Sequence, residues 1–343
     1  MADPGGASPF EGLSRVAIVG IGLIGSSIVH AMRRAGFAGH VAVVDRDGDA
    51  RAEAERLGIG DSWHGDGAGV AGADAVVLSV PVGAMGAVAA AIAPHLSAGA
   101  ILFDTGSVKA AVIRAVGEHL PDPTRFVAAH PVAGTEQSGP SAGFAELFDR
   151  RWCILTPTET TRPEAVERVA ALWRAFGSDV ETMTPEHHDL VLAMTSHLPH
   201  LIAYNIVGTA YDMERVTSQE VIKFSAGGFR DFTRIAASDP TMWRDVFLNN
   251  KEAVLETLGR FSEDLAALQR AIRWGDGETL FDLFTRTRAI RRSIIDAGQD
   301  APQPDFGRWA NRRPSGAAAP ASEVGDDDRR DAPERNDARR HAS

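Results

Sequence analysis

The chain has 343 residues, of which 44% are hydrophobic and 24% are charged, the composition of a globular protein large enough for two domains. Its formal net charge of −11 argues against nucleic acid or an anionic membrane surface as a partner. The single cysteine, Cys153, excludes an intrachain disulfide, and its apolar neighbours favour a buried core residue over a nucleophile. No targeting signal is visible and no apolar run reaches the ~20 residues of a membrane span, so we expect a cytoplasmic protein.

A glycine-rich fingerprint follows a short segment, residues 1–12, whose Gly, Pro and acidic residues predict a flexible N-terminus. The apolar run Val16–Val19 predicts a buried strand, and a helical pattern then continues to Gly36. A second apolar run, Val41–Val44, ends in Asp45. This strand, glycine turn, helix and strand together have the length of a dinucleotide-binding unit.

The three glycines of this unit have G-x-G-x-x-G spacing, and each has a distinct role. Gly20 permits a tight turn, Gly22 lets the backbone approach a pyrophosphate, and Gly25 lets the helix pack closely on the sheet. The first helical residues, Leu23 and Ile24, present backbone N–H groups and the positive end of the helix dipole to the phosphates.

The choice of dinucleotide depends on the end of the second strand. Asp45 lies twenty residues after Gly25, where a carboxylate accepts hydrogen bonds from the adenosine ribose. The same carboxylate repels a 2′-phosphate, so we expect NAD to be preferred over NADP. Arg46, the next residue, softens this preference, which leaves NADP as a weaker alternative.

Strand and helix patterns alternate beyond this unit. Further strands are predicted at Ala73–Val80, Ala100–Asp104, Phe126–Ala129, Trp152–Thr156 and Val180–Met183. The alternation predicts an α/β domain over residues 13–185, with a mostly parallel, doubly wound sheet of the Rossmann type. Ligands of such sheets bind at the carboxyl ends of the strands. The cofactor contacts expected at the later strands are Ser79, Val80, Pro81 and Asp104.

Residues 186–300 show only helical patterns, which predicts an all-α domain. Pro199 lies in the middle of a strongly apolar helix, where it predicts a kink. A single helix is expected from Pro240 to Trp274, with an apolar seam at Val254, Leu258, Phe261, Leu265, Leu268 and Ile272. This seam packs either on a second subunit or inside the same chain. Residues 311–343 are rich in Pro, Ala, Asp and Arg, which predicts a disordered tail.

Several polar residues outside the glycine turn are candidates for chemistry. Ser107 follows a strand end, and His130 leaves a strand into a glycine-punctuated loop, where it is either catalytic or a hydrogen-bonded structural group. His197 and His200 are three residues apart, like half of a metal site. No further ligand has matching spacing, so we expect no metal and favour residues that line a cavity.

Two arginines, Arg230 and Arg234, lie one helical turn apart. They form either a solvated surface pair or a carboxylate-binding site whose geometry Asp231 holds.

Taken together, these motifs resemble the prephenate and arogenate (cyclohexadienyl) dehydrogenase family over residues 13–300. The matching segments are GIGLIGSS (20–27), DTGSVK (104–109), HPVAGTEQSG (130–139), SHLPH (196–200) and GGFRDFTRIAASDPTMW (227–243). The resemblance implies a Rossmann domain joined to an all-helical domain that forms a homodimer. It also implies NAD-dependent oxidative decarboxylation of prephenate or arogenate in tyrosine biosynthesis.

The resemblance further implies residue roles. His130 accepts the proton of the ring hydroxyl, and Ser107 hydrogen-bonds the hydroxyl region and steers His130. Arg234 pairs with a substrate carboxylate, and His197, His200 and Thr135 line the pocket. Apart from the resemblance, we expect Arg230, one helical turn before Arg234, to contact the substrate as well. The position of Glu136, six residues after His130 in the same loop, leaves two possibilities. Its side chain either reaches the far end of the pocket, where it favours the ammonium of arogenate, or points to solvent or pairs with an arginine.

Two other functions remain open at this point. A β-hydroxyacid or imino-acid dehydrogenase shares the same domain plan, but such enzymes commonly use a lysine in the helical half, and no such motif competes here. A nucleotide-sensing protein without catalysis gives no reason for Ser107 and His130 to occur together.

Overall fold

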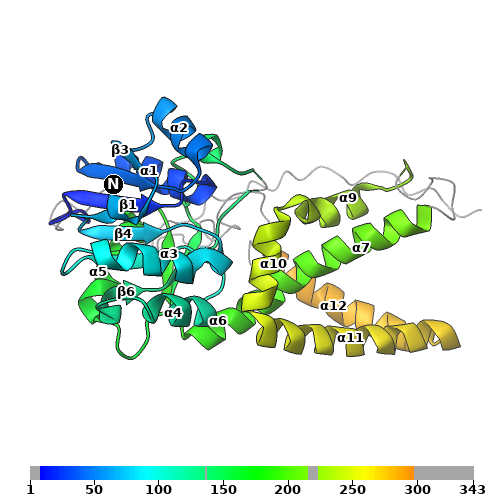
Figure 1. Ribbon diagram of the computed structural model, residues 1–343. Coiled ribbons are helices and arrows are strands. Elements are labelled where there is room, and N and C mark those ends of the chain that lie inside the picture. Colours follow the sequence, from blue (N-terminus) through cyan, green and yellow to red (C-terminus); the bar gives the residue numbers. More distant parts are fainter. Residues whose placement is uncertain (1–7, 136, 215–222, 297–343) are drawn as a thin grey trace, which may run out of the picture.

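The computed structural model describes residues 8–135, 137–214 and 223–296. An N-terminal α/β domain lies beside a set of long helices, and α6 (Pro185–Leu192) connects the two parts (Figure 1). Residues 311–343, where we expect a disordered tail, and Glu136 lie outside the described residues.

The N-terminal domain contains a six-stranded sheet in which all neighbouring strands are parallel. Its strand order is β3-β2-β1-β4-β5-β6, which is the order of the Rossmann fold, so the predicted fold class is confirmed. The strands are β1 (Arg15–Val19), β2 (His40–Val44), β3 (Ser62–His64), β4 (Ala75–Leu78), β5 (Ile101–Asp104) and β6 (Phe126–Val127). The three-residue β3 is not predicted by the sequence, because it contains no apolar run.

Alternate residues of each strand build two cores, one on each face of the sheet. On β1, Val16 and Ile18 pack with one core, whereas Ala17 and Val19 pack with the other. The first core is covered by α1 (Leu23–Arg34), α2 (Gly48–Arg56) and α5 (Pro163–Ala175), and the second by α3 (Met85–Ile92) and α4 (Ala110–Gly117).

A second, three-stranded sheet has the order β7-β8-β9, with β7 antiparallel to β8 and β8 parallel to β9. Its strands are β7 (Ala129–Pro131), β8 (Trp152–Leu155) and β9 (Asp179–Thr182). The predicted strand Phe126–Ala129 is therefore split between two sheets, and the two later strands do not extend the main sheet as expected.

The split has a local cause in side-chain hydrogen bonds. Asp104 accepts a hydrogen bond from the backbone N–H of Ala129 at 3.0 Å, and Lys109 Nζ donates to the carbonyl of Ala129 at 2.6 Å. Both backbone groups of Ala129 are thus occupied by side chains, so the pairing with β5 ends there. One residue earlier, the carbonyl of Ala128 accepts from Thr156.

The first long helix of the C-terminal part is interrupted where a kink is predicted. A π-helical turn, Ala193–His197, separates α6 from α7 (Leu198–Glu214), immediately before Pro199. Such turns re-aim the side chains around them. The stretch Pro185–Met213 is long and apolar enough, by length and composition alone, to cross a membrane. Its first turns, however, carry buried polar groups and belong to the globular fold.

The prediction of a single helix from Pro240 to Trp274 is wrong, because the structure has two helices there. They are α10 (Pro240–Asn249) and α11 (Lys251–Trp274), separated at Asn250, whose φ is −112° and ψ is 35°. The side chain of Asn250 is buried and bonds to other elements, which holds it out of the helix. The remaining helices are α9 (Gly227–Thr233) and α12 (Gly277–Asp296).

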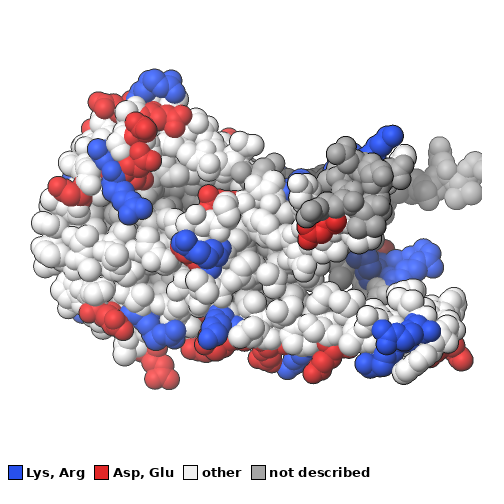
Figure 2. Space-filling model, turned by 45° about the vertical axis from the view of Figure 1, so that its right-hand side comes forward, with Lys and Arg blue, Asp and Glu red and all other residues white. Residues whose placement is uncertain are grey.

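The segment before β1 packs on the α/β domain. Phe10, in the segment 1–12 that we expect to be flexible, is buried and packs on Phe37, with ring centroids 5.2 Å apart. Cys153 is fully buried, as expected. Charged side chains of both signs are dispersed over the face seen in Figure 2.

Candidate active site

The glycine turn between β1 and α1 has the shape expected for dinucleotide binding. Gly20 has φ of +94°, and an added Cβ would collide with the carbonyl of Ser79. A Cβ on Gly25 would collide with the carbonyl of Gly20, so the helix packs directly on the turn. A Cβ at Gly22 would meet nothing within 4 Å, which leaves room for a pyrophosphate beside Leu23, the first residue of α1.

Asp45 follows β2 and is held beside this turn. One carboxylate oxygen accepts from the backbone N–H of Ile21 at 2.9 Å, and the other accepts from Asp47 at 2.9 Å. The side chain is half-buried, whereas Arg46 is exposed. The three glycines and this carboxylate fit an NAD molecule, which requires open backbone at the pyrophosphate and an acid at the ribose.

The ends of β4 and β5 continue the same edge of the sheet. Ser79 Oγ lies 3.4 Å from Thr105 Oγ1, which joins the ends of these two strands. Val80 is half-buried and Pro81 is exposed. The carboxyl ends of β1, β2, β4 and β5 are therefore linked by direct contacts in a row, as ligand sites of doubly wound sheets require.

Asp104, expected at the cofactor, is instead fully buried. Its carboxylate lies 2.5 Å from Lys109 Nζ, and Lys109 is also fully buried. Burial lowers the pKa of Lys109, and the carboxylate of Asp104 opposes that shift. Asp104 therefore holds the start of β7 through Lys109 and Ala129.

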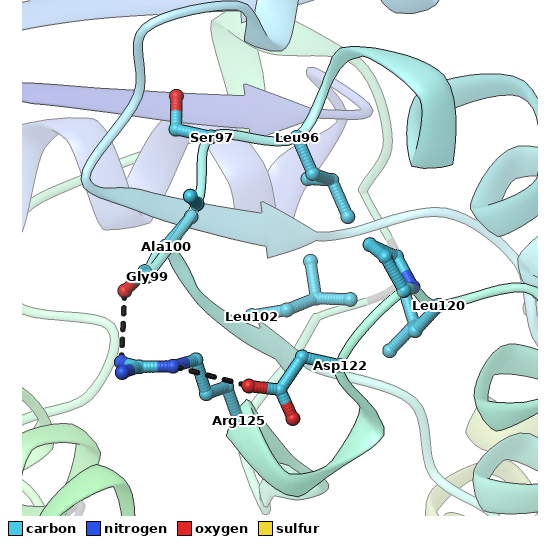
Figure 3. Close-up of a pocket in the computed structure, with 10 residues that line it drawn as sticks. Leu96, Ser97, Gly99, Ala100, Leu102, Leu120, Asp122 and Arg125 are labelled. Carbon is cyan, nitrogen blue, oxygen red and sulfur yellow. Dashed lines mark hydrogen bonds and ion pairs between the residues drawn. The ribbon is translucent and has the colours of Figure 1, made fainter.

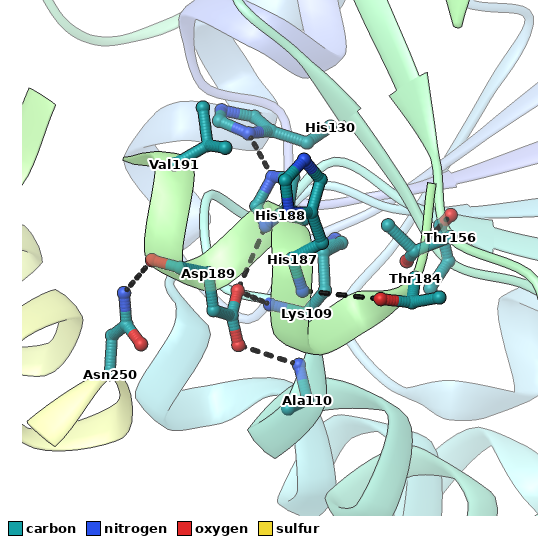
Figure 4. Close-up of polar contacts among 12 residues, drawn as sticks. Lys109, Ala110, His130, Thr156, Thr184, His187, His188, Asp189, Val191 and Asn250 are labelled. Carbon is teal, nitrogen blue, oxygen red and sulfur yellow. Dashed lines mark hydrogen bonds and ion pairs between the residues drawn. The ribbon is translucent and has the colours of Figure 1, made fainter. Parts of the chain in front are cut away.

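His130 lies in β7, one residue beyond this buried pair, and is 8% exposed. Its Nδ1 lies 2.8 Å from Nε2 of His188, and Nδ1 of His188 lies 2.8 Å from a carboxylate oxygen of Asp189 (Figure 4). His188 and Asp189 come from α6 and were not identified from the sequence. Their only sequence signal is the pair His-Asp at the start of the apolar helix, which a surface helix end also shows.

The imidazole of His130 is poised to be neutral. Burial lowers its pKa well below the usual range, and the charges of His188 and Lys109 lower it further. Burial also lowers the pKa of His188, although the hydrogen bond to Asp189 opposes the change. A neutral ring at His130 is the state that accepts a proton.

Ser107 and Thr135 lie in loops of the same domain. Ser107 is half-buried, and among the described residues it has no hydrogen bond to His130. The hydrogen-bond partner of the His130 ring in this structure is His188. The expected role of Ser107 at the substrate's hydroxyl stays a prediction. Thr135 is exposed, and its hydroxyl accepts from the backbone of Gln137 at 3.2 Å.

The two histidines of the SHLPH motif have different surroundings. His197 is fully buried, its Nδ1 lies 3.1 Å from the amide nitrogen of Asn250, and its Nε2 has no partner among the described residues. Burial lowers the pKa of His197 to about 4. His200 stacks on Trp243 with ring centroids 3.7 Å apart, and its Nδ1 donates to the carbonyl of Ser196.

Arg234 lies at the end of α9, and its charge contributes to the lowered pKa of His200, whose main cause is burial. The turn Arg234–Ala237 packs on α7, the helix that carries His200. Arg230 is exposed and pairs with Asp231 at 3.0 Å, as in the solvated surface pair that the sequence leaves open. Among the described residues no group of three or more His, Cys, Asp or Glu is placed to hold a metal.

A cavity of about 350 Å³ lies elsewhere, between the start of β5 and the loop before β6. Arg125 crosses it, with a hydrogen bond to the carbonyl of Gly99 at 2.9 Å and an ion pair with Asp122 (Figure 3). It opens at the amino ends of the strands. Cofactors of doubly wound sheets bind at the opposite edge, so we do not place the cofactor there.

Comparison with known proteins matches this arrangement. The family model described as the nucleotide-binding domain of prephenate dehydrogenase matches residues 28–182, and the model described as its dimerization domain matches residues 184–286. A cyclohexadienyl dehydrogenase of Zymomonas mobilis is 43% identical over 280 residues, covering 81% of this chain and 95% of the relative. A prephenate dehydrogenase of Bacillus subtilis is 32% identical, covering 81% and 76%.

Solved structures show the same likeness. Prephenate dehydrogenase of Aquifex aeolicus, in complex with hydroxyphenyl propionate and NAD⁺, has a TM-score of 0.78 and 37% identity, covering 82% of this chain and 98% of that one. An arogenate dehydrogenase of Synechocystis has a TM-score of 0.67 and 26% identity, covering 81% and 99%. The fold, the dinucleotide turn and both matched domains show that this chain belongs to the prephenate dehydrogenase family.

Proposed function

We propose that this protein catalyses the NAD-dependent oxidative decarboxylation of prephenate or arogenate, which yields 4-hydroxyphenylpyruvate or tyrosine. The observation that carries the proposal is the place of His130 in β7, one residue after Ala129, whose backbone N–H donates to Asp104 at the carboxyl end of β5. Burial lowers the pKa of this imidazole, which favours its neutral form. The glycine turn lies along the same row of strand ends. The names of the relatives, and the NAD⁺ and hydroxyphenyl propionate of the Aquifex aeolicus complex, support it.

In this reaction His130 acts as the general base. Its neutral ring takes the proton of the substrate's ring hydroxyl as the C–O bond becomes a carbonyl. Loss of carbon dioxide then leaves the electron pair of the broken C–C bond in the ring. The ring becomes aromatic, and its phenolate oxygen recovers a proton.

Residues of the glycine turn hold the cofactor. NAD, when bound there, supplies the acceptor for the two electrons and the hydrogen that leave the substrate. Gly20, Gly22 and Gly25 admit the pyrophosphate, and Asp45 binds the ribose and disfavours a 2′-phosphate. We therefore expect a higher kcat/KM with NAD than with NADP.

The substrate's carboxylates bind in the helical half. Arg234 lies in the turn that packs on α7, the helix that carries His200, and is suited to pair with one carboxylate. His197 presents an unpaired ring nitrogen in the same region. We propose these three residues as the substrate contacts, with Ser107 and Thr135 from the α/β domain, and give Arg230 a peripheral role because it pairs with Asp231.

The test is the absorbance of reduced nicotinamide on mixing the protein with prephenate or arogenate, using NAD and NADP in turn. Turnover of a β-hydroxyacid without turnover of either diene would favour the alternative dehydrogenase class. We expect His130→Asn to keep its NAD affinity and to lose ~10²–10⁴-fold in kcat, the usual contribution of a general base. A variant that retains more than about a tenth of the activity contradicts the assignment.

Glu136, which lies outside the described residues, is our proposed selector between the two substrates. Its carboxylate attracts the ammonium of arogenate and repels the purely anionic prephenate. At ~4 Å and an effective dielectric constant near 20, one such pair is worth up to roughly 4 kcal/mol before desolvation. We expect Glu136→Gln to lower the arogenate-to-prephenate ratio of kcat/KM. An unchanged ratio removes Glu136 from this role.

We also infer that the enzyme is a cytoplasmic homodimer. The description of the second family model as a dimerization domain supports the dimer. So do the exposed apolar side chains of the long helices, among them Ile206, Tyr211 and Leu265. The relatives' biosynthetic activity and the single buried cysteine support the compartment.

A further inference from the structure

The network behind His130 has a fixed direction that begins at Asp189. One oxygen of this carboxylate accepts from the backbone N–H of Lys109 at 2.8 Å, and the other accepts from the N–H of Ala110 at 2.9 Å. Backbone N–H groups only donate, so the carboxylate acts as an acceptor on both sides. The ring nitrogen Nδ1 of His188, 2.8 Å from the same carboxylate, must therefore carry a proton and donate it.

The proton on Nδ1 of His188 also determines the tautomer of His130. A neutral imidazole has one N–H and one acceptor nitrogen. With the proton of His188 on Nδ1, its Nε2 is an acceptor, and it lies 2.8 Å from Nδ1 of His130. The contact is a hydrogen bond only if Nδ1 of His130 donates. The remaining nitrogen of His130, Nε2, then has no proton, and among the described residues it has no hydrogen-bond partner.

We propose that His188, held by Asp189, is a positioning residue that keeps the proton of His130 on Nδ1 and leaves Nε2 bare to take the substrate's proton. The proposal rests on the role of His130 as the base. When Nε2 takes the hydroxyl proton, the ring becomes an imidazolium that still donates from Nδ1 to His188. No proton has to leave the network, and the ring keeps one orientation throughout.

Other titratable groups face His130 from each neighbouring element. Lys109 lies before α4, His197 in the π-helical turn, and Cys153 on β8, where its thiol senses the backbone of His130. Lys109 is tied to Asp104 and to the carbonyl of Ala129. Of the described residues, His188 alone forms a side-chain hydrogen bond to the His130 ring.

A purely structural role is the rival interpretation. Asp189 also satisfies the first N–H groups of α4, so its replacement would disturb that helix. Within the described part of the chain, the His188 ring hydrogen-bonds only to Asp189 and to His130. A substitution of His188 therefore changes the orientation of the base and leaves the hydrogen bonds from Asp189 to the start of α4 in place.

The first experiment measures the tautomer directly by ¹⁵N NMR of the full chain labelled in histidine, with His130→Gln to identify the His130 signals among the 11 histidines. We expect a protonated Nδ1 and a bare Nε2 in the wild type, and a mixture of tautomers in His188→Leu. A proton on Nε2 of His130 in the wild type overturns the proposal. This readout does not depend on turnover, so it is distinct from a failure of the proposed function.

The second experiment measures kinetics with prephenate and NAD. We expect His188→Leu to lower kcat by about 10- to 100-fold, part of the ~10²–10⁴-fold worth of a base, with both KM values within about threefold. His188→Gln retains an acceptor for Nδ1 of His130 and should recover most of the loss. His187→Leu changes an exposed neighbouring histidine and serves as the matched control. Equal kcat in His188→Leu and the control overturns the proposal, as does an equal loss in the Leu and Gln variants. If the Leu variant does not fold, the wild-type tautomer and the Gln variant decide.

Discussion

Asp189 gives opposite hydrogen-bonding roles to two histidines. Its side chain leads through His188 to His130, whose Nε2 is left as an acceptor. Its main-chain carbonyl accepts from the amide nitrogen of Asn250, which also faces Nδ1 of His197. That nitrogen donates to both, so Nδ1 of His197 is an acceptor and its Nε2 carries the proton. The site thus uses two histidines in different roles, with His130 as a base and His197 as a hydrogen-bond donor.

The buried His197 makes stability depend on pH. Its folded pKa of about 4 lies below the usual 6.5. As the pH falls below 6.5, the unfolded chain binds a proton that the folded chain does not, so the free energy of unfolding decreases until about pH 4. A shift of this size corresponds to roughly 3 kcal/mol. The lowered pKa values of His130 and His188 act in the same direction.

We expect His197→Asn to flatten this dependence. Its side-chain oxygen takes the place of Nδ1 and still accepts from Asn250, so folding is retained while the titrating group is lost. Urea unfolding of both proteins between pH 4 and 7 measures the effect. The wild type should lose more free energy of unfolding than the variant on acidification. Parallel curves would mean that His197 does not bind a proton on unfolding in this range.

Among the elements, the sequence predicts those whose pattern is local. Apolar runs and glycine positions give the strands and helices of the Rossmann unit, and Pro199 gives the break before α7. The predictions that are wrong concern places where side chains far apart in the sequence determine the structure. The end of β6 depends on Lys109 and Asp104, and the gap between α10 and α11 depends on Asn250. Neither is visible in local periodicity.

The same division applies to the candidate site. His130 and the glycine turn follow from strand ends and spacing, and these are residues that the sequence points to directly. His188, Asp189 and Asn250 are tied to the site through partners 53 to 80 positions away in the chain, so no spacing rule finds them. The burial of Asp104 is hidden for a related reason, because it depends on a pairing with Lys109 that its position at a strand end does not reveal.

The junction of α10 and α11 should therefore tolerate change poorly. Asn250→Ala leaves the carbonyl of Asp189 and Nδ1 of His197 without their shared donor. We expect a loss of roughly 1–3 kcal/mol in the free energy of unfolding, the cost of unsatisfied buried polar groups. Kcat/KM should fall as well.

The adjacent Asn249→Ala is the matched control. Its amide bonds only to the carbonyl of Asp245, one turn earlier in the same helix. Urea unfolding of the two variants measures the difference. Equal losses at both positions would show that Asn250 only breaks the helix and does not connect α11 to α6.

At the scale of the whole molecule, the helical part exposes more apolar surface than a monomer requires. The seam on α11 is buried only at its first residue, Val254, whereas Leu265 and Ile272 are 53% and 67% exposed. On α7, Ile206 and Tyr211 are 39% and 64% exposed. Packing inside one subunit therefore leaves Leu265 and Ile272 largely uncovered, and we propose that a second subunit covers them.

We predict a dimer at micromolar concentration in sedimentation velocity, with α7 inside the interface. Ile206→Glu places an unpaired carboxylate in that apolar contact, and its desolvation opposes association, so the variant should sediment as a monomer. Leu57→Glu is the control, because Leu57 is 40% exposed on the α/β domain, close to the exposure of Ile206, and lies outside the helical part. A monomeric wild type refutes the dimer. A dimeric Ile206→Glu protein beside a dimeric control places the interface elsewhere than on α7.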